Sequence, residues 1–288
     1  MKRVFPESEL IINADGSCFH LHLRPEQMAD RIVLVSDPNS VELVATLFES
    51  KECDVESREF RTITGIYKGK RITCQSYGFG SENIDIVINE LDTLANIDYN
   101  TREEKNEHQT LTIVNVGISE GLLPKITPRT IIASKKVIGF DGLLNYYAGR
   151  NHVCDIPFEN KFTEYMEWDS VKGSPYVVTS EDNLLNQIAQ EDMLIGYTVS
   201  SIGFYAPQGR GLRLPLENDL LKEKLASFEY EGIQICNIDM ESASIIGLAS
   251  LLGHRAISCC IVNDTKQYTL MDKNNSFKSF AQKVLDRI

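Results

Sequence analysis

The stretch IQICNIDMESASIIGLASLL, residues 233–252, decides the fold class of this 288-residue chain. Its first part, 233–239, is rich in isoleucine and predicts a buried strand. The part that follows, 240–252, is apolar nearly all round, which predicts a helix buried within the protein. A buried strand followed at once by a buried helix is typical of α/β proteins, whose helices cover a largely parallel sheet.

The same alternation of strand-like and helix-like segments extends along most of the chain. We therefore expect a single α/β domain over 26–288, with a central mixed, largely parallel sheet flanked by helices, after an N-terminal arm over 1–25. The strands are expected within 31–38, 60–78 (a hairpin), 111–117, 130–140, 176–180, 195–205, 233–239 and 256–264, and the helices at 39–48, 83–95, 240–252 and 276–288.

Composition narrows the classes of function. The net charge of −12 argues against a nucleic-acid partner, because such proteins bind by neutralising phosphates. The sequence has no apolar run of 18 residues or more, and the basic start of the chain is not followed by an apolar segment, so we expect neither a membrane span nor a secretory signal. The seven cysteines include no CxxC pair, which favours free thiols in a cytoplasmic protein.

Polar clusters follow several of the predicted strands. In a sheet of this kind ligands bind beyond the carboxyl ends of the strands, so the clusters together outline one site. They lie at 36–38, 77–80, 117–121, 239–241 and 263–264.

The segment NIDMES carries two acids, Asp239 and Glu241, around Met240. Both acids suit the start of a helix, where Asp239 would be an N-cap and Glu241 a first-turn carboxylate. A carboxylate that faces the crevice would also accept hydrogen bonds from two neighbouring ribose hydroxyls, with Met240 as a soft apolar wall. The residues alone favour neither interpretation.

The segment FYAPQGR, residues 204–210, joins an aromatic pair to Gln208 and Arg210. A solvated turn is the simpler interpretation of the segment by itself. As a binding site, Phe204 would stack on a planar base, while the Gln208 amide and the Arg210 guanidinium would match the carbonyl and N–H groups of uracil. Arg210 would also stabilise the charge of a leaving base.

Three further features are individually weak. VNVGISEG, residues 114–121, predicts a strand that enters a small-residue loop, which suits an anion through Gly117 and Ser119 but contains Glu120 and no cation. His20 and His22 lack further ligands at a suitable spacing, so no metal site is predicted. Arg58 is most simply a surface charge.

Taken together, these motifs resemble the nucleoside phosphorylase family that includes uridine phosphorylase and the hexameric-type purine nucleoside phosphorylases, with uridine phosphorylase the nearer of the two. The resemblance extends from about residue 20 onward. It is carried, in the family's order, by FHLHL, VSDPNSV, SREF, YGFG, VNVGISEG, FYAPQGR, NIDMES and IVNDT.

The resemblance implies one nucleoside phosphorylase-like α/β domain and reversible cleavage of an N-glycosidic bond by phosphate. It implies that Asp239, Met240 and Glu241 form the ribose site, and that Gln208 and Arg210 read a pyrimidine. Arg210 and Glu241 would be the catalytic pair. No cofactor is implied beyond inorganic phosphate as co-substrate.

The resemblance also implies that neighbouring subunits share their sites. His20 would reach the ribose 5′-OH, and Arg58 the phosphate, of the next subunit. The smallest functional unit would then be a homodimer, with a hexamer as the larger alternative.

The chain departs from the family pattern at the phosphate. Where uridine phosphorylases have a GDPxRV turn, this chain has SDPNSV, with Ser36 and Ser40 in place of the glycine and the arginine. Asn115 stands where a second arginine is expected, so only Arg58 remains of three. Two lost charge-assisted contacts, each worth roughly 1.5–3 kcal/mol, predict weak phosphate binding. Glu120 would weaken it further if it faced the phosphate.

Asp264 is the last candidate. An acid near this position protonates the leaving purine in the purine-cleaving and nucleosidase branches, although a turn residue is the interpretation we favour. The leading hypothesis is a uridine phosphorylase-like enzyme of pyrimidine salvage. A phosphate-independent nucleoside hydrolase, with Glu120 as general base, and a non-catalytic nucleoside-binding paralogue are the alternatives.

Overall fold

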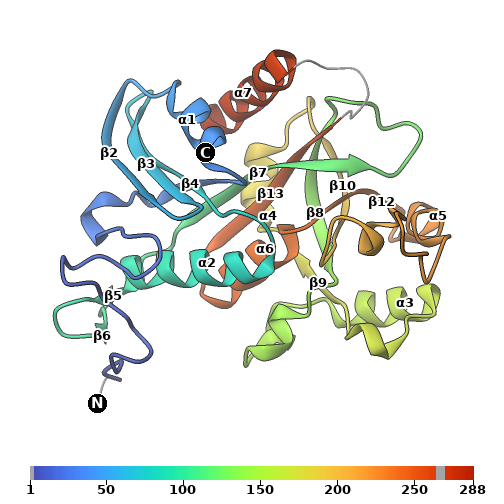
Figure 1. The fold of residues 1–288 in the computed structure, drawn as a ribbon, viewed down its shortest axis with the longest axis horizontal. Helices are drawn as coiled ribbons and strands as arrows, with labels where there is room; N and C mark the ends of the chain where they lie inside the picture. The colour runs from blue at the N-terminus through green and yellow to red at the C-terminus, as the bar shows by residue number, and fades with distance from the viewer. Residues whose placement is uncertain (1–2, 264–269) are drawn as a thin grey trace.

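The computed structural model describes residues 3–263 and 270–288. Its centre is one mixed sheet in the strand order β11-β12-β10-β8-β13-β7-β1-β4-β3-β2, with β9 added to β8 (Figure 1). The strands are β1 Arg31–Val35, β2 Ser50–Ser57, β3 Phe60–Tyr67, β4 Lys70–Ser76, β7 Thr112–Gly121, β8 Ile131–Gly139, β9 Tyr176–Thr179, β10 Leu194–Ser200, β11 Glu229–Tyr230, β12 Ile233–Asp239 and β13 Arg255–Val262; β5 Ile97–Asp98 and β6 Glu103–Glu104 form a separate small hairpin.

Two parallel groups of strands form the centre of the sheet, in agreement with the predicted mixed, largely parallel architecture. β4, β1, β7 and β13 are mutually parallel, and so are β8, β10 and β12. The groups meet in antiparallel fashion where β13 pairs with β8, and again where the end of β7 pairs with β12. The second junction closes β7, β13, β8, β10 and β12 into a ring and brings the ends of β7 and β12 together.

Helices cover both faces of the sheet, so its strands are buried on both sides. On one face α2 Ser81–Asn96 packs beside α6 Ser242–Leu251. On the other, α1 Pro38–Ala45, α4 Asp182–Ile188 and α7 Leu270–Arg287 share a second core cluster (Figure 1). α3 Ile156–Met166 and α5 Leu221–Ser227 flank the β8–β12 end.

The segment 117–121 is not the loop that its glycines predict. β7 continues through it to Gly121, because the segment finds two strand partners. Ser119 pairs with Val262 of β13, and Glu120 with Ile238 of β12. Backbone pairing with strands far away in the sequence therefore overrides the local preference of glycine for a turn.

Other differences from the predicted elements have similar causes. β2 is an edge strand with mostly exposed polar residues, which carry no apolar alternation. β10 ends at Ser200 rather than at 205, and the segment after it is irregular apart from one short 3-10 turn at Ala206–Gln208.

The N-terminal arm lies against the rest of its own chain. The backbone N–H of Phe5 donates to the carbonyl of Arg102, and the Arg102 guanidinium returns a hydrogen bond to the Phe5 carbonyl. Further along, Cys18, Leu21 and Leu23 are buried in the core beside α2. The arm thus supplies core residues as well as His20.

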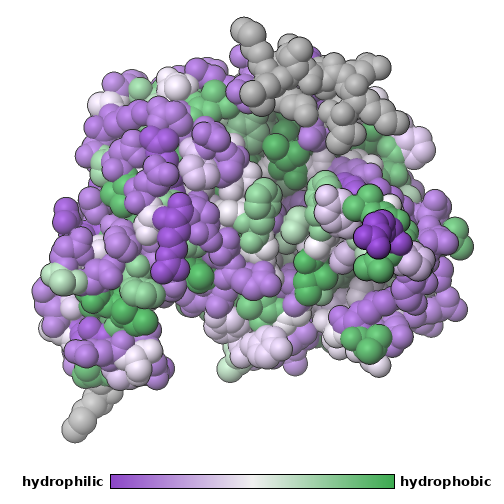
Figure 2. All heavy atoms as spheres, viewed as in Figure 1, coloured by the Kyte–Doolittle hydropathy of each residue, from purple (hydrophilic) through white to green (hydrophobic). Residues whose placement is uncertain are grey.

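No helix within the described residues is long and apolar enough to cross a membrane. On the face drawn in Figure 2 the surface is largely hydrophilic, with hydrophobic residues in small separate patches. That surface agrees with the acidic composition of the chain.

Candidate active site

A ladder of buried polar side chains leads to the junction of β7 and β12. Ser134 bonds Thr198 at 2.7 Å, Thr198 donates to Asn237 Oδ1 at 2.8 Å, and Asn237 Nδ2 donates to Ser119 Oγ at 2.9 Å. The Ser119 oxygen accepts this bond, and no described residue accepts a hydrogen bond from its hydroxyl. Ser119 can therefore still act as a hydrogen-bond donor at the end of β7.

Glu241, next to this junction, is a buried carboxylate that no described side chain pairs with. It directly precedes α6, is only 8% exposed, and makes no capping hydrogen bond to that helix. Its Oε1 accepts one hydrogen bond, from the backbone N–H of Gly80 at 3.1 Å. Burial, and secondly the charge of Asp239, raise the pKa of Glu241 to about 8. Met240 beside it is half-buried.

Gly80 can approach Glu241 because its backbone has φ +89°, which favours glycine. A Cβ at this position would lie 2.7 Å from Glu82 Oε2. The turn between β4 and α2 thus presents an N–H group to the carboxylate.

Asp239 is held by side chains of neighbouring strands and of α6. Its carboxylate is buried and accepts hydrogen bonds from Ser200 Oγ at 2.6 Å and from Ser242 Oγ. The thiol of Cys260 lies 3.5 Å away, and burial raises the pKa of Asp239. Both carboxylate oxygens are thus bonded to neighbouring strands and to α6, so Asp239 joins β12, β10 and α6, and its predicted ribose contact stays a prediction.

Arg210, Gln208 and Phe204 come together as predicted. The Arg210 guanidinium lies 4.0 Å from the centre of the Phe204 ring, and its Nη1 donates to the Phe204 carbonyl at 2.5 Å and to Gln208 Oε1. Gln208 is buried, whereas the Phe204 ring is 50% exposed. An open aromatic face beside an amide and a guanidinium suits a planar heterocycle.

Glu120 belongs to the same cluster. Its carboxylate pairs with Arg210 Nη2 through one oxygen and with Lys222 Nζ at 2.6 Å through the other. Lys222 comes from α5 and was not singled out by its sequence context. Glu120 is thus bound to cations at the end of the site where Phe204 and Gln208 lie.

The segment after β1 also differs from a simple anion loop. Asp37 caps α1 by accepting from the Ser40 backbone N–H at 3.0 Å and from the Ser40 hydroxyl at 2.6 Å. Ser36 Oγ lies 3.3 Å from the same carboxylate. The two serines that replace the expected glycine and arginine are therefore held by an acid.

Asn115 is buried beneath the end of β7. Its Nδ2 donates to Ser258 Oγ at 2.8 Å, and its Oδ1 has no partner among the described residues. A Cβ at Gly117 would lie only 3.1 Å from this amide and 3.0 Å from Cys260 Sγ. Asn115 thus packs against β13 and does not substitute for an arginine that reaches into the crevice.

The remaining candidates are not joined to this cluster within one described chain. His20 donates from Nδ1 to Glu90 at 2.6 Å, and Glu90 also accepts the backbone N–H of His20. Arg58 is exposed in the β2–β3 turn with φ +57° and makes no ion pair with the described residues. Asp264 lies outside the described residues.

Three residues of types that often bind metals lie together outside this cluster. The potential ligand atoms of Asp92, His108 and His254 lie within 4.8 Å of one another. The backbone N–H of Leu111 donates to His254 Nδ1 at 3.2 Å, so the neutral ring carries its hydrogen on Nε2, 3.1 Å from Asp92. A nitrogen that carries a hydrogen cannot bind a metal. Although Nε2 lies 3.1 Å from Asp92, it makes no hydrogen bond of suitable geometry to any described residue.

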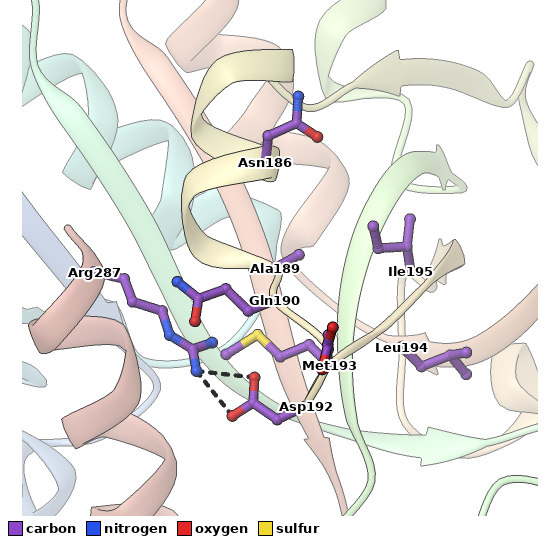
Figure 3. Close-up of a pocket in the computed structure, with 9 residues that line it drawn as sticks. Asn186, Ala189, Gln190, Asp192, Met193, Leu194, Ile195 and Arg287 are labelled. Carbon is purple, nitrogen blue, oxygen red and sulfur yellow. Dashed lines mark hydrogen bonds and ion pairs between the residues drawn. The ribbon is translucent and has the colours of Figure 1, made fainter.

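A groove of about 860 Å³ lies at the opposite end of β10 (Figure 3). Met193, Leu194 and Ile195 form part of its wall, and its Asp192 carboxylate is already paired with Arg287 at 2.9 Å. None of the predicted site residues lines this groove. It is separate from the side-chain cluster at the ends of β7 and β12.

Sequence reasoning missed the partners of the site residues. Lys222, Asn237 and Glu90 lie in ordinary helical or strand contexts that no motif marks. The available signal was that Asn237 lies between the apolar residues Cys236 and Ile238 of the predicted strand, where a buried amide needs hydrogen-bond partners.

Residues 30–288 match the model of the phosphorylase superfamily. The chain is 27% identical to uridine phosphorylase of Thermococcus kodakarensis over 272 residues, covering 91% of this chain and 82% of the relative. It is 22% identical to the DeoD-type purine nucleoside phosphorylase of Streptococcus suis, covering 93% of this chain and 98% of that one.

Solved structures agree on the fold. A Trypanosoma brucei nucleoside phosphorylase described as showing uridine phosphorylase activity superposes with a TM-score of 0.85, at 24% identity, over 97% of this chain and 99% of that chain. A uridine phosphorylase of Phytophthora capsici gives a TM-score of 0.73 at 19% identity, over 98% and 97%.

Proposed function

Because this chain belongs to the phosphorylase superfamily, we propose that it is a uridine phosphorylase-like enzyme, which cleaves a pyrimidine nucleoside with phosphate into free base and ribose 1-phosphate. Its membership makes it a pentosyltransferase of the nucleoside phosphorylase type. The observation that carries the finer proposal is the packing of Arg210 between Phe204 and Gln208. These three residues offer a stacking face and hydrogen-bond donors to a pyrimidine.

The ribose would be held by Glu241 and Met240. An ionised Glu241 accepts hydrogen bonds from the 2′- and 3′-hydroxyls, and its bond from the Gly80 N–H fixes the carboxylate against them. The apolar side chain of Met240 would lie along the sugar. Asp239 contributes by holding the end of β12 in place.

In the reaction, the bond between C1′ and the base nitrogen breaks and a phosphate oxygen bonds C1′. The electron pair of the broken bond leaves with the base, and the positive charge of Arg210 stabilises the resulting anion before it takes a proton from water. Ser119 would donate its free hydroxyl hydrogen to the phosphate. Ser36, the backbone of Gly117 and Arg58 of a neighbouring subunit would complete the anion site.

A homodimer is proposed as the smallest active unit. The support is that neither Arg58 nor His20 bonds Glu241 or Arg210 within the described chain, while Arg58 is exposed and makes no ion pair with the described residues. The Arg58 side chain is thus available to a neighbouring subunit, whereas His20 keeps only its Nε2 for such a contact, since its Nδ1 is paired with Glu90.

A phosphate-independent nucleoside hydrolase is the second candidate. One observation favours it: Asn115 is bonded into the interior and Ser40 to Asp37, so neither position offers a cation to a phosphate. Water needs no such cations. The Glu120 general base earlier considered for this reaction has its carboxylate paired with Arg210 and Lys222 instead.

One experiment separates the two candidates. The protein is incubated with uridine with and without phosphate, and the sugar product is identified by mass spectrometry. Phosphate-dependent release of uracil with ribose 1-phosphate supports the phosphorylase. Free ribose formed at a rate that phosphate does not change supports the hydrolase, and no release of uracil at high enzyme and phosphate concentrations contradicts both for uridine.

A further inference from the structure

Glu120 pairs with Arg210, which is proposed to bind the base, and has no bond to Ser119, which is proposed to bind the anion. Adjacent residues of a strand point to opposite faces, and Ser119 and Glu120 are neighbours in β7. Ser119 bonds Asn237, whereas Glu120 pairs with Arg210. A carboxylate on the face opposite to Ser119 is not positioned to repel or activate a nucleophile bound by Ser119.

The contacts of Arg210 show what Glu120 controls. A guanidinium has five N–H groups, and the two on Nη1 donate to the Phe204 carbonyl and to Gln208 Oε1. Glu120 takes one hydrogen of Nη2, which fixes the plane of the guanidinium over the Phe204 ring. Among the described residues, Nε–H and the second Nη2 hydrogen have no acceptor, so they are available to a ligand.

Lys222 offsets the charge of Glu120. With Arg210 and Lys222 both paired to one carboxylate, the trio keeps a single positive charge at the base end. The stem of Lys222 also packs beside Gly209, since a Cβ there would lie 3.2 Å from Lys222 Cγ. Lys222 is thus held against the same turn that carries Gln208 and Arg210.

We propose that Glu120 is a positioning residue for recognition of the base, which sets the orientation of Arg210, and that Lys222 supplies the positive charge that lets Arg210 stabilise the leaving base despite this carboxylate. The proposal rests on the proposed function at the same site. It assigns Glu120 and Lys222 to base binding and departure, and neither of them to the nucleophile.

The test uses Glu120→Gln and Lys222→Met in the full chain. The matched controls are Glu167→Gln and Lys224→Met, because Lys224 lies two residues from Lys222 on α5 and pairs with Glu167 at 2.7 Å. Binding of free uracil is measured by calorimetry. The KM values for uridine and for phosphate are measured separately.

Glu120→Gln is expected to weaken uracil binding and raise the uridine KM by roughly five- to tenfold, since one charge-assisted hydrogen bond becomes a neutral one. The phosphate KM should stay within about twofold of the wild-type value. Lys222→Met should lower kcat more for uridine than for 5-fluorouridine, whose base is the better leaving group. Both controls should match the wild-type protein.

Unchanged uracil affinity in Glu120→Gln, or a changed phosphate KM, overturns the proposal. An equal loss of kcat on both nucleosides in Lys222→Met overturns its second part. Uracil binding needs no turnover, so the proposal survives if the wild-type protein binds uracil and Glu120→Gln weakens it, even where uridine is not cleaved and the proposed function fails. Absence of uracil binding by the wild-type protein overturns the proposal itself.

Discussion

The backbone N–H of Gly80, in the turn between β4 and α2, donates a 3.1 Å hydrogen bond to Oε1 of Glu241 at the start of α6. This bond stabilises the ionised carboxylate, but burial and the nearby charge of Asp239 outweigh it and keep the pKa at about 8. The free protein therefore holds Glu241 largely protonated at neutral pH. Only the ionised form accepts hydrogen bonds from both ribose hydroxyls.

We therefore predict that kcat/KM for the nucleoside rises with pH, by nearly tenfold per pH unit well below pH 8, and levels off above it. The profile is measured between pH 6 and 9.5 with phosphate saturating. Glu241→Gln should lack this limb and retain little activity. A profile that is flat or falls between pH 6 and 8 contradicts a ribose-binding carboxylate at this position.

The same raised pKa predicts a stability gain in Glu241→Gln. Between pH 4.5, the ordinary pKa, and about pH 8, Glu241 holds a proton in the folded protein but has lost it in the unfolded chain. The free energy of unfolding of the wild-type protein therefore falls as the pH rises through this range, and it levels off above about pH 8. Gln cannot ionise. At pH 9 the free energy of unfolding of the variant should exceed that of the wild-type protein by roughly 1–4 kcal/mol, and at pH 4 the two should be similar.

Urea unfolding at the two pH values provides the measurement. If the variant were less stable than the wild-type protein at pH 9, the pKa of Glu241 in the folded protein would not be raised, and the prediction would be wrong.

Asp239 is predicted to act on stability. Asp239→Ala leaves the hydroxyls of Ser200 and Ser242 without their buried acceptor, which should lower the free energy of unfolding by roughly 2–4 kcal/mol. Urea midpoints are compared with those of Glu241→Gln at the same pH. If Asp239→Ala had the stability of the wild-type protein and a raised KM for the nucleoside, the result would instead indicate that Asp239 binds the ribose.

The overall fold could be predicted because its strands are apolar runs and its central helix is apolar all round. Glu241, Gln208 and Arg210 could be predicted because their motifs are local in the sequence. The partner of Glu120 could not: GISEG favours a loop, and only pairing with β12 gives it an extended backbone. The opposite orientations of Ser119 and Glu120 follow from that pairing, as does the cluster with Lys222.

Ser40→Arg is predicted to tighten phosphate binding. The resemblance to uridine phosphorylases implies an arginine at this position. In this chain the position is Ser40, whose hydroxyl donates a hydrogen bond to Asp37. One restored charge-assisted contact should lower the phosphate KM by roughly tenfold. Asn39→Arg, at the exposed neighbouring position of α1, is the matched control for net charge. Equal effects of the two variants would mean that the added charge acts at long range and not by contact.

The last prediction concerns the shared site of the proposed homodimer. Arg58→Ala should lose phosphate binding, and Arg210→Ala should lose base binding, so each variant alone should be nearly inactive. In a heterodimer of the two, one site combines Arg210 of the first chain with Arg58 of the second and is intact, while the other site lacks both. Random mixing gives heterodimers in half of the molecules, so activity should recover to about a quarter of the wild-type value.

The variants are mixed, dissociated in mild denaturant, reassociated and assayed. Mixtures no more active than the separate variants would mean that Arg58 serves its own chain, because then every site in the mixture lacks one of the two arginines.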